Sequence, residues 1–313
     1  MTPTAADAPD ASRPEAPGRS LWSDAFRRLS RDRAAVACFA VICLYVFVAV
    51  YAQFRYADFH TSQDYERRNQ PPSRAHWLGT DVFGRDVLAK TLLGAKVSMT
   101  VGFMANAIAV PLGLVLGSMA GFFGRRVDDL IVWVYTTLAS VPSIILLIAL
   151  KYAFQGLVLF RDTWAEIDLS GIHGLYIALA VTSWIGTCRL TRAETLKLKS
   201  MDYVTAARAS GQGSLRILLR HIIPNLFHLA IINFTLGFVG AITAEVILSF
   251  LGLGVSVGTP SWGTMINAAR MDLVVGRWWE FASAVGAMFF IVLSLNIFGD
   301  RLRDALDPRL RVG

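Results

Sequence analysis

Six stretches of this chain are long and apolar enough to cross a lipid bilayer as helices, which takes about 18 or more mostly apolar residues. They cover residues 34–53, 98–122, 130–153, 173–190, 228–250 and 281–298. The fourth stretch, HGLYIALAVTSWIGTCRL, is the weakest because it contains several small polar residues. The pattern predicts an all-α polytopic membrane protein with six transmembrane helices in a domain that spans residues 34–298.

The composition agrees with a membrane protein and excludes several other classes. Hydrophobic residues make up 54% of the chain and charged residues only 17%, which is unlike a soluble protein. The net charge of +7 is not accompanied by a basic and aromatic module, so we expect no nucleic-acid partner. Cys38, Cys43 and Cys188 lie in apolar stretches without metal-ligand spacing, which predicts neither a disulfide nor a metal site.

Lys and Arg residues are concentrated on one side of the predicted membrane domain. They gather in the tail 1–33, in the loop after the second stretch, in the loop 191–227 and in the tail 299–313. Because cytoplasmic loops carry the excess of Lys and Arg, both termini and the 191–227 loop are predicted to be cytoplasmic, and the 54–97 loop external. The first apolar stretch begins too far from Met1 for a signal peptide, so the tail 1–33 is expected to be disordered.

The cytoplasmic loop 191–227 is predicted to contain two short helices. Residues 203–210 are Ala-rich and favour a helix, and Gly211-Gln212-Gly213 interrupts it. Ser214 is a candidate cap for the second helix, which Pro224 is expected to end. The apolar residues of that helix recur at i, i+3, i+4 and i+7, and they are Leu215, Leu218, Leu219 and Ile222. The pair resembles a docking knob, and the alternative is an amphipathic loop that lies on anionic membrane lipid.

The sequence of this loop, DYVTAARASGQGSLRILLRHIIPN over 202–225, resembles the cytoplasmic "EAA" loop of ATP-binding-cassette importer permeases. The similarity is greatest to the C-type permease subunit of dipeptide and oligopeptide importers. Four further blocks are similar to that branch in the same order, and they cover residues 18–37, 76–99, 249–265 and 299–311. Residues 1–17 and 151–172 have no counterpart in the resemblance.

The resemblance implies a type I ABC importer permease fold in a bacterial inner membrane. It also implies transport of di- or oligopeptides, although related permeases handle nickel, opine or sugar-derived substrates. The expected partners are a homologous B-type permease, two ATPase subunits and an external solute-binding protein. The chain has no Gly-Lys-Ser or Gly-Lys-Thr of a phosphate-binding loop, so it is expected to be non-catalytic, with no cofactor of its own, and ATP and Mg would be bound by the ATPases.

The resemblance further implies that the 202–225 loop couples ATP hydrolysis to movement of the spans. The candidate coupling residues are Tyr203, Thr205, Ala206, Ala207, Arg208, Ser210, Gly211, Arg216, Arg220, His221, Pro224 and Asn225. The family usually has Glu where this chain has Thr205, so one charged contact of the family's loop is missing here.

Polar residues within the apolar stretches are candidates for a pore or gate, and we single out Glu245, Asn233, Ser140 and Ser143. Glu245 is the one carboxylate inside a predicted span, and such a residue is a functional hypothesis by default. The alternative for Glu245 is solvation near the membrane boundary. For the hydroxyl and amide residues the alternative is hydrogen bonding between helices.

Other motifs predict packing and external contacts. Gly113, Gly117 and Gly121 form a stripe at every fourth position that predicts close helix packing, and Pro111 and Pro142 mark kinks. In the 76–96 block, a turn is followed by a helix from Arg85. The charged residues there, Asp81, Arg85 and Asp86, are either contacts for a binding protein or a solvated salt-bridge cluster. The connection 151–172 is longer than the family's and would either cap the pore or touch a binding protein.

Two other function classes compete with an importer permease. A gradient-driven transporter or channel is the first, although proton coupling normally needs more than one intramembrane acid. An intramembrane hydrolase is the second, because Gly254-Val255-Ser256-Val257-Gly258 reads G-x-S-x-G. A nucleophile elbow needs a strand before the serine and a histidine partner, and no histidine follows His228. We therefore interpret 254–258 as a Gly-rich external turn.

Overall fold

The computed structural model describes residues 21–56, 59, 63–163, 166–255 and 258–306. This part of the chain is predominantly helical, and its α-helices are α1 (Leu21–Arg31), α2 (Arg33–Arg55), α3 (Val87–Phe123), α4 (Arg125–Ala139), α5 (Ser143–Ala153), α6 (Ile172–Leu198), α7 (Asp202–Ala209), α8 (Ser214–Ile217), α9 (Ile223–Phe250), α10 (Trp262–Val274) and α11 (Trp279–Leu306). A 3₁₀ turn covers Tyr65–Arg67, a π-helical turn covers Leu218–Ile222, and two short strands, β1 (Val158–Leu159) and β2 (Ile167–Asp168), pair antiparallel.

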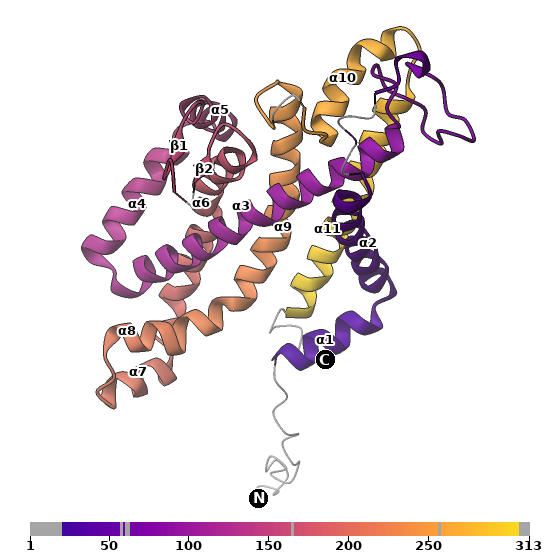
Figure 1. Ribbon diagram of the computed structural model, residues 1–313. Helices are drawn as coiled ribbons and strands as arrows, with labels where there is room; N and C mark the ends of the chain where they lie inside the picture. Colours follow the sequence, from indigo (N-terminus) through magenta and orange to yellow (C-terminus); the bar gives the residue numbers. More distant parts are fainter. Residues whose placement is uncertain (1–20, 57–58, 60–62, 164–165, 256–257, 307–313) are drawn as a thin grey trace, which may run out of the picture.

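The long helices run between two ends of the molecule (Figure 1). One end, at the top of the view, carries α10 and the loop that precedes α3, and we call it the α10 end. The other carries α1, α7 and α8, and we call it the α7 end. The 37 residues of α3 give a helix of about 55 Å at 1.5 Å per residue. Because the apolar core of a bilayer is about 30 Å thick, a helix of this length crosses it obliquely or extends beyond it.

Among the described residues, four helical segments are long and apolar enough to cross a membrane: α2, α3, the continuous segment Ser214–Phe250, and α11. The helices α4 and α5 make a fifth only if they count as one span, because they bend by 90° at residues 140–142. Pro142 lies at this break, so the predicted kink is confirmed there, whereas Pro111 lies inside the uninterrupted α3. The predicted fourth span forms α6, whose polar residues keep it below the apolarity of the others.

The closest helix pair in the bundle is α3 with α6, and the glycine stripe makes this possible. A Cβ atom added at Gly113 would lie 2.6 Å from the carbonyl oxygen of Trp184, and one at Gly121 would lie 2.7 Å from the Cβ of Thr195. The α3 backbone at this contact also accepts a hydrogen bond, because Thr191 Oγ1 donates to the Gly113 carbonyl at 3.1 Å. The prediction that the stripe packs against another helix is confirmed, and the partner lies in this chain.

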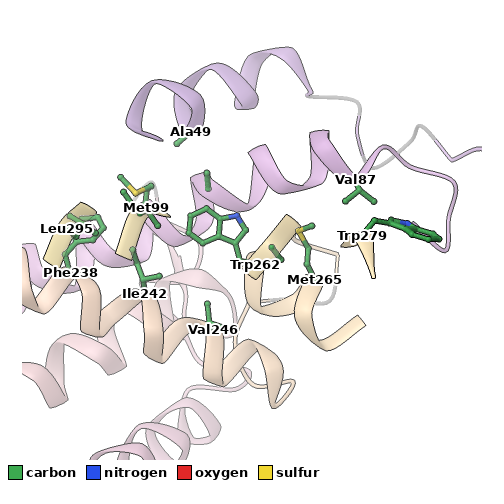
Figure 2. Close-up of a cluster of buried hydrophobic side chains, with 13 residues drawn as sticks. Ala49, Val87, Met99, Phe238, Ile242, Val246, Trp262, Met265, Trp279 and Leu295 are labelled. Atoms are coloured by element: carbon green, nitrogen blue, oxygen red, sulfur yellow. The ribbon is translucent and has the colours of Figure 1, made fainter. Parts of the chain in front are cut away.

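A hydrophobic core near the α10 end fixes α10 to the membrane helices. Figure 2 shows the Trp262 indole between α3 and α9, with Met265 and Val246 beside it. Trp262 is fully buried, and its Nε1 donates to the Thr91 carbonyl of α3 at 3.1 Å. Gly94 leaves the room for the indole, because a Cβ there would lie 2.8 Å from Trp262 Cδ1. The first turn of α10 is therefore held inside the bundle.

A buried ion cluster joins the loop before α3 to the start of α11. Lys90 Nζ lies 3.0 Å from Asp81 Oδ2 and 2.6 Å from Glu280 Oε1, and Arg85 pairs with Asp81 at 2.9 Å. Burial by itself raises the pKa of Asp81, but Lys90 and hydrogen bonds from Arg85 outweigh it and lower the pKa overall. Because Asp81 is buried, both sequence interpretations, a solvated cluster and a contact for a binding protein, are wrong for this residue.

The helix predicted from Arg85 begins two residues later, at Val87, because Asp86 is its N-cap. Asp86 Oδ1 accepts from the backbone N–H of Ala89 at 3.1 Å, and Oδ2 pairs with His76 Nδ1 at 2.8 Å. Asp86 is thus engaged within the chain as a cap for α3.

The 151–172 connection folds back onto the helices that it joins. The strands β1 and β2 pair in the register Val158 to Asp168 and Leu159 to Ile167. The buried Lys151 of α5 donates to the carbonyls of Ser170 at 2.6 Å and Gly171 at 2.8 Å, directly before α6. The connection is therefore anchored to both α5 and α6.

We expect Gly117→Ala to destabilise the protein, because the added methyl group collides with Thr191 and with the Cys188 carbonyl. Overpacking of this kind costs about 1–3 kcal/mol. The measurement is the midpoint of thermal unfolding of the purified protein in detergent, which should fall. Gly286→Ala is the matched control, since a Cβ at Gly286 meets no described atom within 4 Å. Equal midpoints for the two variants would contradict the packing role of the stripe.

Lys90→Met should destabilise the protein by about 3–5 kcal/mol, because it leaves Asp81 and Glu280 buried without their shared cation. The double variant Lys90→Met with Glu280→Met should recover part of the loss, since the Asp81–Arg85 pair remains.

The pKa of Asp81 is lowered, so the contribution of Asp81 to stability is complete above the ordinary carboxyl pKa of about 3.9. That contribution is lost only as the pH falls through the lower pKa of the folded state. Asp81→Asn should therefore lower the unfolding midpoint equally at pH 5 and pH 7, and a smaller effect at pH 5 would refute this.

Candidate functional site

At the α7 end, residues 202–222 form a compact projection that we call the α7–α8 knob. It comprises α7, the turn 210–213, α8 and the π-helical turn. Two hydrogen bonds close the end of α7, from the backbone N–H of Gly211 to the Arg208 carbonyl and from that of Gln212 to the Ala207 carbonyl. This is the Schellman arrangement, which needs a left-handed residue, and Gly211 supplies it with a φ of +76°. The predicted turn between two helices is confirmed.

The knob is fixed to the bundle by a hydrophobic cluster. Its buried side chains are Val204, Ala207, Ile217, Leu218 and Ile222, which pack with Val110, Leu114 and Phe122 of α3 and with Leu226 and Ala230 of α9. The predicted apolar face is partly wrong, because Leu215 is 62% exposed and Leu219 is 56% exposed. The side of this segment that packs on the bundle contains Ile217 of α8 and Leu218 of the π-helical turn, and the other two leucines point away from the core.

The second helix of the knob does not end at Pro224, which corrects the prediction. A helix runs from Ser214 to Phe250, and Pro224 lies in the first turn of α9. Proline removes one N–H donor and its ring crowds the carbonyl four residues earlier. The π-helical turn at Leu218–Ile222 directly precedes α9, whose second residue is Pro224, and such turns are a recognised way for a helix to accommodate an interruption. The predicted cap is also displaced, since Gly213 occupies the N-cap position and Ser214 begins the helix.

The outward face of the knob is an exposed groove of mixed character. Its volume is about 740 Å³, and it is lined by Gly213, Leu215, Arg216, Leu219, Arg220 and Pro224. Two exposed leucines beside two exposed arginines form a surface that suits an apolar and acidic partner surface. The structure thus brings Arg216, Arg220 and Pro224 of the predicted coupling set together.

The other predicted coupling residues have structural roles or lie on other faces of the knob. His221 Nε2 lies 3.0 Å from Gln212 Oε1, which ties the turn to the π-helical segment, and Asn225 Nδ2 approaches the Tyr203 hydroxyl at 3.5 Å. Arg208 lies over the Phe122 ring at 5.4 Å. Thr205 and Ser210 hydrogen bond to carbonyls of α7 and the residue before it, Ala206 is exposed, and Ala207 is buried.

A second candidate region is a cavity of about 700 Å³ between α3, α5, α6 and α9, which we call the α3–α9 cavity. Its polar lining residues are Asn106, Ser143, Thr182, Ser183, Thr187, Asn233 and Thr243. Ser183, Gly186 and Gly240 of its lining are exposed, so the cavity opens on one face of the chain. Asn233 and Ser143 were predicted as pore residues, and both lie here.

Ser140 and Glu245 lie elsewhere. Ser140 is at the α4–α5 break, where its hydroxyl donates to the Thr137 carbonyl at 2.7 Å. Glu245 is fully buried and accepts hydrogen bonds from Ser98 of α3 at 3.0 Å and from Ser249 of α9 at 2.8 Å. Solvation at the membrane boundary is therefore wrong for Glu245, which joins two helices of this chain.

Sequence reasoning missed the contribution of α6 to the cavity. Thr182, Ser183 and Thr187 lie at spacings that place them along one side of that helix, and the structure puts all three on the cavity wall. The available signal was the weak apolarity of the 173–190 stretch. The serine of the G-x-S-x-G sequence, Ser256, lies outside the described residues.

Comparisons with known proteins assign the chain to a family. Residues 113–312 match the family described as binding-protein-dependent transport system inner membrane component, and residues 20–72 match the N-terminal TM domain of oligopeptide transport permease C. The chain is 34% identical over 310 residues to the oligopeptide transport system permease protein OppC of Bacillus subtilis, with 99% of this chain and 96% of the relative covered.

Two further relatives are similar over most of their length. The dipeptide transport system permease protein DppC of Bacillus subtilis is 34% identical over 295 residues, which cover 94% of this chain and 88% of the relative. The glutathione transport system permease protein GsiD of Escherichia coli is 36% identical over 294 residues, which cover 94% of this chain and 92% of the relative.

One solved structure shares the fold. A chain from the inward-facing MetNI methionine ABC transporter superimposes with a TM-score of 0.52 at 15% identity, covering 71% of this chain and 96% of that chain. This likeness concerns the helix arrangement alone. The family matches over residues 20–72 and 113–312 and the three relatives lead to one assignment: the chain belongs to the family of binding-protein-dependent inner membrane transport components, as a permease of the peptide ABC importer group.

Proposed function

We propose that this chain is one of two permease subunits of an ATP-driven importer of di- or oligopeptides in a bacterial inner membrane. Its partners would be a homologous B-type permease, two ATPase subunits and an external solute-binding protein. The peptide cargo is proposed from the oligopeptide, dipeptide and glutathione permeases that resemble the chain along nearly their whole length. ATP and Mg would be bound by the ATPases, and this chain would hold no cofactor.

The main support for this proposal is the continuous helix that runs from the knob to the cavity. Residues Ser214–Phe250 form one helix, whose first turns present Leu215 and Leu219 at the surface. The same helix lines the α3–α9 cavity through Asn233, Gly240 and Thr243. A partner that pushes on the knob therefore acts directly on a wall of the cavity.

The knob is also coupled to α3, so that a push would move two cavity helices together. Its buried face contacts Val110 and Leu114, and Asn106 of the same helix lines the cavity one turn away. Packed helices move as rigid units when an interface has two stable arrangements. Alternating access would then follow from ATP-driven movement of the knob, with the open side of the cavity covered by the second permease.

The proposed topology has six spans with both termini in the cytoplasm. The bent pair α4–α5 would count as one span and the polar α6 as another, in addition to the four apolar segments. The end of α11 packs against α1 through Leu306 and Ala25, so the two terminal segments lie at the same end as the knob. The 54–97 and 151–172 loops would face outward, and the tails 1–33 and 299–313 and the 191–227 loop would face inward.

Leu219→Glu should weaken binding of the ATPase to the purified importer, because it places a charge on the exposed apolar part of the knob. Exposure of Leu219 means that the fold is expected to tolerate the change. The measurement is the amount of ATPase that co-purifies with the tagged chain in mild detergent, and we expect a loss of at least about tenfold. Leu196→Glu, an exposed residue of α6 in the same cytoplasmic loop, is the control and should retain the ATPase.

If the two variants retain the ATPase equally, the knob is not the docking surface. Recovery of the wild-type chain alone, with neither a second permease nor an ATPase, would instead favour a gradient-driven transporter. In the first case the wild-type chain still brings down the ATPase, and in the second it does not. The wild-type sample therefore distinguishes a wrong docking surface from a wrong class of function.

The topology is tested with reporters fused at two places. A green fluorescent protein fused after Gly313 should fluoresce and alkaline phosphatase fused there should be inactive, because only the phosphatase needs export from the cytoplasm. When each reporter is inserted after Gln155, in the 151–172 connection, alkaline phosphatase should be active and green fluorescent protein should not fluoresce. Phosphatase activity at the C-terminus would overturn the proposed orientation.

A further inference from the structure

The glycines of the membrane helices differ in what surrounds them. A Cβ atom at Gly102 or Gly237 would come too close to Phe238 or Asn106, as at the α3 stripe. At Gly186 of α6 and Gly240 of α9 a Cβ would meet no described atom within 4 Å. Both of these glycines are exposed and line the α3–α9 cavity.

Close packing against other helices of this chain does not explain why residues 186 and 240 are glycine. A glycine inside a helix is less favourable than alanine by about 1 kcal/mol, and tight packing of the backbone is its usual compensation. These two positions lack such packing but add to the width of the cavity, from the two helices α6 and α9. An alanine or leucine at either position would project a side chain into space that is now open.

The described residues that line the same cavity carry no formal charge. Among its described lining residues, the polar ones are asparagine, serine and threonine. Several of their donors are already engaged within their own helices, as Asn233 Nδ2 donates to the Leu229 carbonyl at 2.8 Å and Thr243 Oγ1 to the Val239 carbonyl at 2.9 Å. A fixed charge in the wall would attract cargo of opposite charge and repel cargo of like charge. The described wall residues, being neutral, would have neither effect.

We propose that Gly186 and Gly240 set the width of this half of the passage, so that it sorts peptides by the bulk of their side chains. This inference rests on the proposed function for the identity of the cargo. Its structural part, a water-filled passage bordered by these two glycines, is independent of the cargo.

The transport test uses the complete importer with its binding protein, reconstituted in proteoliposomes. The variants are Gly186→Leu and Gly240→Leu, with Gly286→Leu on α11 as the matched control. A Cβ at Gly286 also meets no described atom within 4 Å, but none of the described residues that line the cavity belongs to α11. The cargoes are Ala-Gly-Ala, Ala-Trp-Ala, Ala-Lys-Ala and Ala-Glu-Ala. Each uptake rate is divided by that of the wild-type importer, which removes the preference of the binding protein.

We expect the two cavity variants to lower uptake of Ala-Trp-Ala relative to Ala-Gly-Ala by at least about tenfold. The ratio of Ala-Lys-Ala to Ala-Glu-Ala should stay at the wild-type value, and Gly286→Leu should change neither ratio. The wild-type rate of ATP hydrolysis in each variant would show that the complex is intact. An equal fall for the Trp and Gly peptides would overturn the proposal.

A second measurement does not depend on the cargo. Gly186→Cys, Gly240→Cys and Gly286→Cys are made in the complete importer after Cys38, Cys43 and Cys188 are replaced by alanine. A small charged methanethiosulfonate reagent should modify residues 186 and 240 at least about tenfold faster than residue 286, because thiolates react only where water reaches them. Equal rates at the three positions would overturn the proposal, and fast modification without any peptide uptake would retain the passage but refute the peptide cargo.

Discussion

The helix bundle is organised around the close approach of α3 and α6. The stripe Gly113, Gly117 and Gly121 removes side chains from one face of α3, so that the backbone of α6 packs directly against it. Because apolar side chains gain nothing from leaving lipid for another apolar surface, close packing and hydrogen bonds must hold such helices together. Thr191 of α6 donates one of these bonds to the carbonyl of the buried Gly113. With α6 fixed on one side of α3, α9 packs on another, and the α3–α9 cavity lies among these helices and α5.

Polar residues in the membrane helices are used in two different ways. Glu245 and its serine partners, like the Lys90 cluster, are buried and satisfied by one another, and they hold α3, α9 and the start of α11 in fixed positions. The amides and hydroxyls of the cavity bond mainly within their own helices and leave a neutral wall. The buried groups would be costly to separate, so the α10 end is expected to move as a unit when the cavity changes shape.

The π-helical turn at Leu218–Ile222 allows the knob and the cavity wall to belong to one helix. Without an adjustment of this kind, Pro224 would break the helix between the surface leucines and Asn233. The continuous helix Ser214–Phe250, which connects the knob to the cavity wall, is about 55 Å long at 1.5 Å per residue. A force applied at Leu219 reaches the cavity lining through hydrogen-bonded backbone, and not through a flexible loop.

The expectation of a disordered tail over residues 1–33 is wrong for α1, which is helical over Leu21–Arg31. The sequence alone was enough to predict the membrane class, the approximate places of the apolar helices, the turn at Gly211 and the packing role of the glycine stripe. These features follow from runs of apolar residues, from local backbone preferences and from fixed spacing along one helix, all of which are local. The resemblance of the 202–225 loop added the family. Other features became visible only in the folded protein: Leu215 and Leu219 face outward, Pro224 lies inside a helix, Asp81 is buried beside Lys90 and Glu280, and α6 lines the cavity. Each of these depends on which face of a helix meets residues far away in the chain, and the periodicity of a single segment does not contain that information.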